Sequence, residues 1–309
     1  MSGLVVLGSA NTDLTVSVQR LPGRHETVLG GDFRVSFGGK GANQALAARL
    51  AGARVTFFSR IGTDTYGNLL FDHLAAKGLD REGLLRDSGS PAGVALVVVD
   101  REGNNQIAVA PGSNARFRVQ DLHGLEHLFR RGTVCLAQLE IPLETVQYGL
   151  QTAKSQGLVT VLDPAPCREL PREVLEQVDV LTPNEREAGE LAGMEVASPQ
   201  EALKAARILR QRGAGAVVVT LGPQGAVLDM RDRRERIPAF EVQAVDSVAA
   251  GDAFSGALAA GLARSWSWPE ALRFASAAAA LSTTRRGAQE SLATEAEIRA
   301  FLDSREVSR

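Results

Sequence analysis

The sequence predicts an α/β fold, with a mostly parallel central sheet covered by helices on both faces and a small antiparallel β lid beside it. Three observations lead to this prediction. Short runs of β-branched residues alternate with segments of helical periodicity along most of the chain. Some of these runs, such as 216–221, are apolar without alternation, as in strands buried on both sides. Two stretches, 12–37 and 92–110, contain pairs of strand-like segments with no helix between them.

The first part of the chain begins with the strand-like run LVVLGS at 4–9. Residues 40–52 have helical periodicity and finish on Gly52, a residue typical of a helix C-terminal cap. A strand at 54–62 and a helix at 65–78 follow. This order predicts the repeated strand–helix–strand units of a parallel sheet.

The same alternation continues through the rest of the chain. The predicted elements, in order, are strand 133–140, helix 143–157, strands 158–166 and 179–185, helix 199–213, strand 216–222, an alternating strand at 237–245 and a helix from 251 to 263. No linker rich in Pro, Gly or Ser divides them, so residues 1–309 are predicted to form one domain.

The stretches 12–37 and 92–110 interrupt this alternation. The first is a strand, a turn and a second strand, and the second is a hairpin around Glu102–Asn105. They are interpreted either as peripheral decoration or as a lid that closes over a site at the sheet edge and excludes water.

Composition excludes several classes of protein. The formal net charge of -2 gives no basic surface for nucleic acid. No apolar run is long enough to span a membrane, and the N-terminus has no secretion-signal pattern, so a cytoplasmic protein is expected. Cys135 and Cys167 are too few for a disulfide framework. The four histidines lack metal-ligand spacing and are expected at the surface.

The glycine-rich stretch SFGGKGANQA at 36–45 precedes a predicted helix. Gly38, Gly39 and Gly41 allow a ligand to approach the backbone, and the N-terminus of the helix follows. Lys40 and Asn43 lie about one turn apart, which suits a ligand rich in hydroxyl groups. The spacing matches neither a P-loop nor a dinucleotide fingerprint. The alternative interpretation is an ordinary flexible turn.

The stretch DSVAAGD at 246–252 places a carboxylate on each side of a small turn, and it is predicted to lead from a strand into a helix. Ala249, Ala250 and Gly251 leave the first backbone N–H groups of the helix accessible to a transferring phosphoryl group. Asp252 is placed to accept a proton from an attacking hydroxyl group, and Asp246 to bind a cation. The alternative role for Asp252 is a helix cap.

Five motifs in register, GSANTD, SFGGKGANQA, TPNEREA, VTLGPQG and VDSVAAGDAFSGAL, resemble the ribokinase-like members of the PfkB family of sugar kinases. The resemblance extends from Leu4 to about Leu302. It implies ATP-dependent phosphorylation of D-ribose at its 5-hydroxyl group, with Mg²⁺ on the ATP phosphates, a bound K⁺ and a homodimer formed through the lid.

The resemblance also assigns roles to individual residues. Asp252 matches the catalytic base, and Ala249, Ala250 and Gly251 match the anion hole. The sugar would be bound by Asn11, Asp13, Gly39, Lys40, Asn43 and Glu140. ATP would lie along Asn184, Thr220, Gly222, Gly225 and Ser276, with Glu187 organising the water shell of Mg²⁺. The K⁺ ligands would come from Asp246, Val248, Ser282, Arg285, Gly287 and Ser291.

This chain departs from common forms of the family at three positions. Ala250 stands where glycine is commonest, Ser276 where a larger polar side chain often flanks adenine, and Glu290 where some members have proline. Two alternatives to ribose phosphorylation stay open. One is a kinase of another sugar, such as 2-deoxyribose, fructose or a nucleoside. The other is a non-catalytic sugar-binding regulator on the same scaffold.

Overall fold

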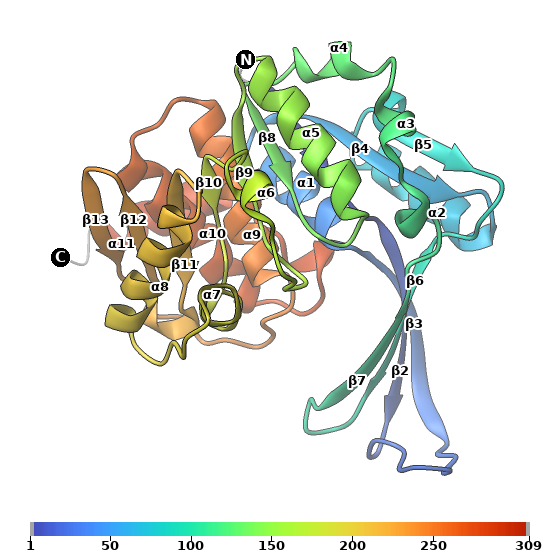
Figure 1. Ribbon diagram of the computed structural model, residues 1–309. Helices are drawn as coiled ribbons and strands as arrows, with labels where there is room; N and C mark the ends of the chain where they lie inside the picture. The colour runs from blue at the N-terminus through green and yellow to red at the C-terminus, as the bar shows by residue number, and fades with distance from the viewer. Residues whose placement is uncertain (1–2, 307–309) are drawn as a thin grey trace.

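The computed structural model describes residues 3–306, and its main feature is a sheet of nine strands (Figure 1). Neighbouring strands are parallel except at one edge, where β12 is antiparallel to both β11 and β13. The predicted mostly parallel sheet is therefore confirmed. In spatial order the strands are β13 (Arg233–Ile237), β12 (Ala226–Met230), β11 (Ala216–Thr220), β10 (Val180–Leu181), β9 (Val159–Leu162), β8 (Val134–Ala137), β1 (Gly3–Leu7), β4 (Arg54–Gly62) and β5 (Leu84–Asp87).

Helices cover both faces of this sheet, and each face has its own apolar core. Successive residues of β1 point to opposite faces, so Leu4 and Val6 pack in one core while Val5 and Leu7 pack in the other. The first core contains α1 (Lys40–Leu50), α2 (Thr65–Ala76), α9 (Ala250–Ala263), α10 (Trp268–Thr283) and part of α11 (Glu295–Glu306). The second contains α3 (Val119–Leu122), α4 (Glu126–Phe129), α5 (Leu143–Ser155), α6 (Arg172–Leu175), α7 (Glu185–Ala192) and α8 (Pro199–Gln211).

Helices α1 and α9 pack closely, and Gly256 makes this possible. A Cβ atom at Gly256 would lie 2.7 Å from both the Cβ of Ala47 and the carbonyl oxygen of Gln44. The side chains at the beginning of the two helices consequently meet at the same edge of the sheet.

A second, four-stranded sheet projects from the main body (Figure 1). This lid sheet has the order β3 (Gly30–Gly38), β2 (Asn11–Val18), β6 (Gly93–Val99), β7 (Asn105–Ala110). The two predicted strand pairs form antiparallel hairpins, and the hairpins join through parallel pairing of β2 with β6. In the β6–β7 turn, the Asp100 carboxylate accepts hydrogen bonds from the backbone N–H groups of Glu102 and Asn104.

Three details of the sequence prediction were wrong. Residues 238–249 form no strand, because the N–H groups of Val245 and Asp246 both donate to the Thr283 carbonyl at the end of α10. The strand predicted at 179–185 is only two residues long. His73 is partly buried rather than at the surface, with its ring 4.2 Å from the Phe37 ring and its Nε2 2.8 Å from Gln289 Oε1.

Among residues 3–306, none of the helices is both long and apolar enough to cross a membrane.

Candidate functional site

The glycine-rich stretch lies where the lid sheet meets the main sheet. Gly39 has a φ of 86°, and a Cβ atom there would lie 2.8 Å from Ala10 Cα and Asn11 N. Glycine is therefore needed for the beginning of α1 to pass against the chain that follows β1. The Lys40 backbone N–H donates to Glu140 Oε2 at 2.9 Å, and the same oxygen accepts from Ser9 Oγ at 2.5 Å.

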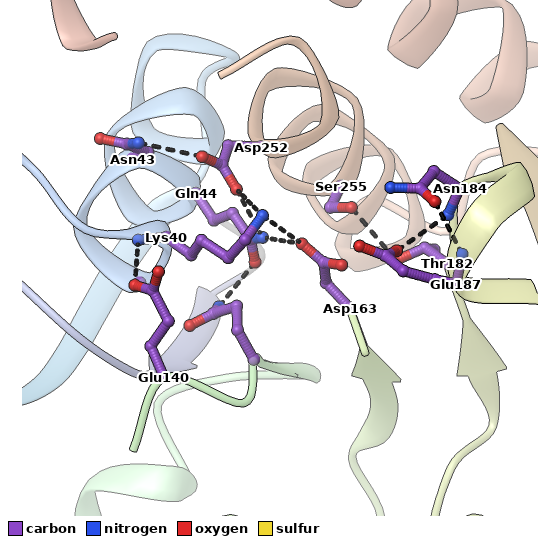
Figure 2. Close-up of polar contacts among 12 residues, drawn as sticks. Lys40, Asn43, Gln44, Glu140, Asp163, Thr182, Asn184, Glu187, Asp252 and Ser255 are labelled. Atoms are coloured by element: carbon purple, nitrogen blue, oxygen red, sulfur yellow. Dashed lines mark hydrogen bonds and ion pairs between the residues drawn. The ribbon is translucent and has the colours of Figure 1, made fainter. Parts of the chain in front are cut away.

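Asp252 belongs to the polar cluster in Figure 2 and is only 4% exposed. Its Oδ2 accepts a hydrogen bond from Asn43 Nδ2 at 2.9 Å, and its Oδ1 accepts one from Gln44 Nε2 at 3.0 Å. Lys40 Nζ lies 3.7 Å from Oδ1. Helix α9 begins after Ala249 without a side-chain cap, so the alternative role of Asp252 as a capping residue is wrong.

The N-terminus of α9 has an unusual backbone. Ala249 adopts a left-handed conformation, with φ 61° and ψ 9°, which is uncommon and strained for a residue other than glycine. A Cβ atom at Gly251 would meet no atom within 4 Å, so the first turn is open to a ligand. Helix N-termini of this kind favour anions.

Asp163, at the end of β9, is part of the same cluster and was missed in the sequence. Its Oδ2 accepts from Gln44 Nε2 at 2.6 Å and lies 3.8 Å from Lys40 Nζ (Figure 2). Burial raises the pKa of Asp163 to about 7, the neighbouring Lys40 opposes this rise, and Asp252 and Glu187 add to it. Burial would lower the pKa of Lys40, but Asp252 and Asp163 outweigh it and hold that pKa above its usual range.

Two of the predicted sugar-binding residues come from the beginning of β2. Asn11 Oδ1 accepts a hydrogen bond from Asn114 Nδ2 at 2.7 Å, and Asn114 is a second residue that sequence reasoning missed. Burial, followed by the nearby Glu140 and Glu290 carboxylates, raises the pKa of Asp13 to about 7.

Asn43, on α1, uses only one of the two polar atoms of its side-chain amide within the described residues. Its Nδ2 donates to Asp252, but its Oδ1 is buried without a hydrogen-bond partner among the described residues. Buried polar atoms are rarely left unpaired in folded proteins, so this oxygen fits a ligand that supplies a hydroxyl donor.

The residues assigned to ATP lie at the ends of β10 and β11 and on α10. Asn184 and Thr220 form a parallel bridge, and Asn184 and Glu187 cap α7 reciprocally through their side chains. Gly225 has a structural reason to be glycine, since a Cβ atom there would lie 2.0 Å from the Ile237 carbonyl oxygen. A Cβ atom at Gly222 would meet nothing within 4 Å.

Ser276 is partly buried on α10, about two turns before the end of that helix.

The residues assigned to K⁺ surround the turn that precedes α9. The Asp246 carboxylate accepts from the N–H groups of Val248 and Gly287, each at 3.0 Å, and so ties this turn to the loop after α10. Ser282, in the last turn of α10, and Ser291, in the loop that follows, each donate a hydroxyl hydrogen bond to a backbone carbonyl three residues earlier. The side chain of Arg285 pairs with Glu297, with Nη2 2.6 Å from Oε1.

Comparison with known proteins identifies the family of the chain. The model of the pfkB family carbohydrate kinases matches residues 1–295. The chain is 39% identical over 300 residues to a ribokinase of Haemophilus influenzae, covering 97% of this chain and 98% of that protein. It is 32% identical over 304 residues to a deoxyribokinase of Salmonella typhi, covering 98% and 99% respectively. The structure of Arabidopsis thaliana ribokinase complexed with ribose and ATP matches with a TM-score of 0.92 at 30% identity, covering 98% of this chain and 99% of that one. The chain therefore belongs to the pfkB family of carbohydrate kinases.

Proposed function

We propose that this protein, a sugar kinase of the ribokinase type, transfers the γ-phosphoryl group of ATP to O5 of D-ribose. The observation that carries the proposal is the position of Asp252, which is buried at the open N-terminus of α9 and held by Asn43 and Gln44 of α1. The chain also matches along almost its whole length a ribokinase complexed with ribose and ATP.

In this reaction Asp252 is the general base. It takes the proton from the attacking 5-hydroxyl group, a contribution that is typically worth about 10²–10⁴-fold in rate. In the proposed anion hole of Ala249, Ala250 and Gly251, the N–H groups of Ala249 and Gly251 would donate to the transferring phosphoryl group, and the positive end of the α9 dipole adds to their effect. The Ala250 N–H donates to the Ser247 carbonyl oxygen at 3.2 Å, so it would have to be shared. The Lys40 ammonium, 3.7 Å from Asp252, supplies further positive charge.

The sugar is recognised through its hydroxyl groups. Asn11 and Asp13 approach it from the lid strand β2, while Gly39, Lys40 and Asn43 approach it from the beginning of α1 and Glu140 from beyond β8. The unpaired Asn43 Oδ1 accepts one of the sugar hydroxyl groups. A site built from such groups rejects an analogue that lacks a hydroxyl group, because its own buried polar atoms are then left unpaired.

ATP lies along Asn184, Thr220, Gly222, Gly225 and Ser276, with Mg²⁺ on its phosphates. The carboxylate of Glu187 near this position fits a hydrated Mg²⁺ ion. Its Oε2 accepts a hydrogen bond from the Asn184 N–H group, and its Oε1 could therefore accept one from a water molecule bound to the metal. When bound, Mg²⁺ neutralises charge on the phosphates.

The loop around Asp246 fits K⁺. The donor set consists of oxygen atoms only, with one carboxylate and backbone carbonyls from residues such as Val248, Arg285 and Gly287, and hard monovalent cations prefer such ligands. Asp246 already joins this loop to the turn before α9. A cation held there compensates the Asp246 charge beside the anion-binding helix N-terminus.

The lid sheet has two roles in this proposal: it closes over the sugar, and it pairs with the lid sheet of a second copy to form a homodimer. Leu14 is paired with both Val35 and Leu96, so these three side chains share one face of the lid sheet. Phe33 and Leu96 are 62% and 53% exposed. An apolar face this exposed is typical of a surface that a partner covers.

Phosphorylation of a sugar panel tests the proposed function. ADP release would be measured with ATP, Mg²⁺ and K⁺ and with ribose, 2-deoxyribose, fructose or a nucleoside, and the Asp252→Asn variant would serve as the blank. We expect the highest kcat/KM with ribose. Equal values for ribose and 2-deoxyribose would favour the activity named for the Salmonella typhi relative. Ribose binding without turnover of any sugar would favour a regulator.

A further inference from the structure

We propose that Asp163 is a positioning residue for phosphoryl transfer, which fixes the Gln44 amide and the Lys40 ammonium against Asp252. The inference rests on the proposed function, in which Asp252 is the base. Asp163 lies beyond the end of β9, whereas Lys40 and Gln44 belong to α1 and Asp252 to α9. The four side chains thus join three separate elements of the fold.

The contacts of Gln44 show how the two carboxylates are joined. Its single Nε2 atom lies 2.6 Å from Asp163 Oδ2 and 3.0 Å from Asp252 Oδ1, so one amide nitrogen donates to both (Figure 2). Lys40 Nζ lies between the same two oxygens, 3.8 Å from Asp163 and 3.7 Å from Asp252. Gln44 Nε2 and Lys40 Nζ are therefore each shared between Asp163 and Asp252. If one carboxylate is lost, both donors are free to move toward the remaining carboxylate.

Gln138 fixes the direction of this arrangement. Its Nε2 donates to Gln44 Oε1 at 2.6 Å, so the amide oxygen of Gln44 is occupied and its nitrogen faces the carboxylates. Gln138, Gln44, Asp163 and Asp252 are all buried. Gln138 Oε1 itself has no hydrogen-bond partner among the described residues, but both polar atoms of the Gln44 amide are paired. A buried amide held at both atoms has one orientation, which is the requirement for a base that must meet a hydroxyl group in line with ATP.

The charges around Asp163 make its ionisation matter for the site. It faces Lys40 from α1, Asp252 from α9 and Glu187 from α7, and burial raises its pKa to about 7. Below that pH the network holds a neutral Asp163, and above it Asp163 adds a negative charge that fixes Lys40 more firmly. We therefore expect the charge on Asp163 to change near neutral pH.

The test compares Asp163→Ala and Asp163→Asn with the parent enzyme. Alanine removes the acceptor for Gln44 and should lower kcat by about 10²-fold, the effect expected for a misplaced catalytic group, while the KM for ribose stays within a few-fold. Asparagine keeps an acceptor, so its kcat should match the parent at pH 6 within a few-fold. As the pH rises through 7, its kcat should fall behind that of the parent.

A matched control and a spectroscopic measurement separate positioning from stability. Asp229, on β12, is also buried but pairs with Arg210 of α8 and Arg234 of β13, so Asp229→Asn should lower stability and leave the pH profile of kcat unchanged. Carboxyl ¹³C NMR of the full chain should show Asp13 and Asp163 titrating near pH 7 in the parent, and the Asp163 signal alone should be missing in Asp163→Asn. This measurement compares the parent with Asp163→Asn, so it tests the role of Asp163 even if Asp163→Ala does not fold.

Two results would overturn the inference: an Asp163→Ala enzyme with the kcat of the parent, or pH profiles of parent and Asp163→Asn that superpose. If Asp252→Asn is inactive in the same experiments, only the role of Asp163 is lost. If Asp252→Asn is active, the proposed base itself is wrong.

Discussion

Replacement of Asp13 by asparagine should stabilise the fold above neutral pH and at the same time weaken the use of ribose. Burial and the Glu140 and Glu290 carboxylates raise the pKa of Asp13 from 3.8 to about 7. Between pH 3.8 and about pH 7, Asp13 keeps its proton in the native state but has lost it in the unfolded state. The free energy of unfolding therefore falls as the pH rises through this range. Above pH 7 the full cost of the buried charge is present.

The size of this cost follows from the pKa difference. Each pKa unit corresponds to about 1.36 kcal/mol, which gives an upper limit of about 4 kcal/mol at pH 8, and the partial exposure of Asp13 reduces it to roughly 1–3 kcal/mol. Asparagine carries no charge at any pH. The Asp13→Asn variant should therefore be more stable than the parent by roughly this amount at pH 8, and by less at pH 5.

Urea unfolding at the two pH values measures the effect. Asp72→Asn, on the exposed surface of α2, is the matched control and should change stability by less than about 0.5 kcal/mol at both pH values. Under the proposed function, kcat/KM for ribose should fall by about 10-fold or more in Asp13→Asn, because a charged acceptor is lost. A gain in stability that is absent at pH 8, or equal at pH 5 and pH 8, would refute the reasoning.

Three further predictions concern the cation and the lid sheet. Replacement of Na⁺ by K⁺ at constant ionic strength should raise activity in the parent and not in Asp246→Ala. If K⁺ does not change the activity of the parent, the role of Asp246 is only structural, through its hydrogen bonds to Val248 and Gly287. Saturation with ribose should slow hydrogen exchange in 12–37 and 92–110, and unchanged exchange in both segments would contradict closure. Phe33→Asp, on the exposed apolar face of the lid sheet, should shift a dimer to a monomer in light scattering, whereas a parent that is already monomeric would exclude the dimer.

Much of the site could be predicted because its residues follow local signals. The glycines before α1 are needed where the chain passes close to Ala10, and Asp252 lies in the first turn of α9 as its helical pattern indicated. The wrong prediction of a strand at 237–245 has the opposite cause. Its alternation is real, but at its end the Val245 N–H donates to the carbonyl of Thr283, a partner distant in sequence.

The residues that were missed depend on contacts between distant parts of the chain. Gln44 lies in a predicted helix, and nothing in its neighbourhood shows that its amide meets carboxylates at positions 163 and 252. A signal existed for Asp163 and Gln138, since both lie in the last few residues of predicted strands, 158–166 and 133–140, near the edge at which open parallel sheets bind ligands. Asn114 gave no comparable signal, because its partner Asn11 lies more than one hundred positions earlier.

The central claim is that Asp252 removes the proton from the attacking sugar hydroxyl group. Phosphoryl transfer from ATP to ribose in a single turnover, measured for the parent and for Asp252→Asn, tests it most directly, with ribose binding followed by calorimetry on the same samples. The claim predicts a rate lower by about 10²–10⁴-fold with ribose affinity changed by no more than a few-fold, because asparagine keeps the shape of the side chain and the contact with Asn43. A variant that binds ribose and transfers the phosphoryl group within a few-fold of the parent rate would contradict it.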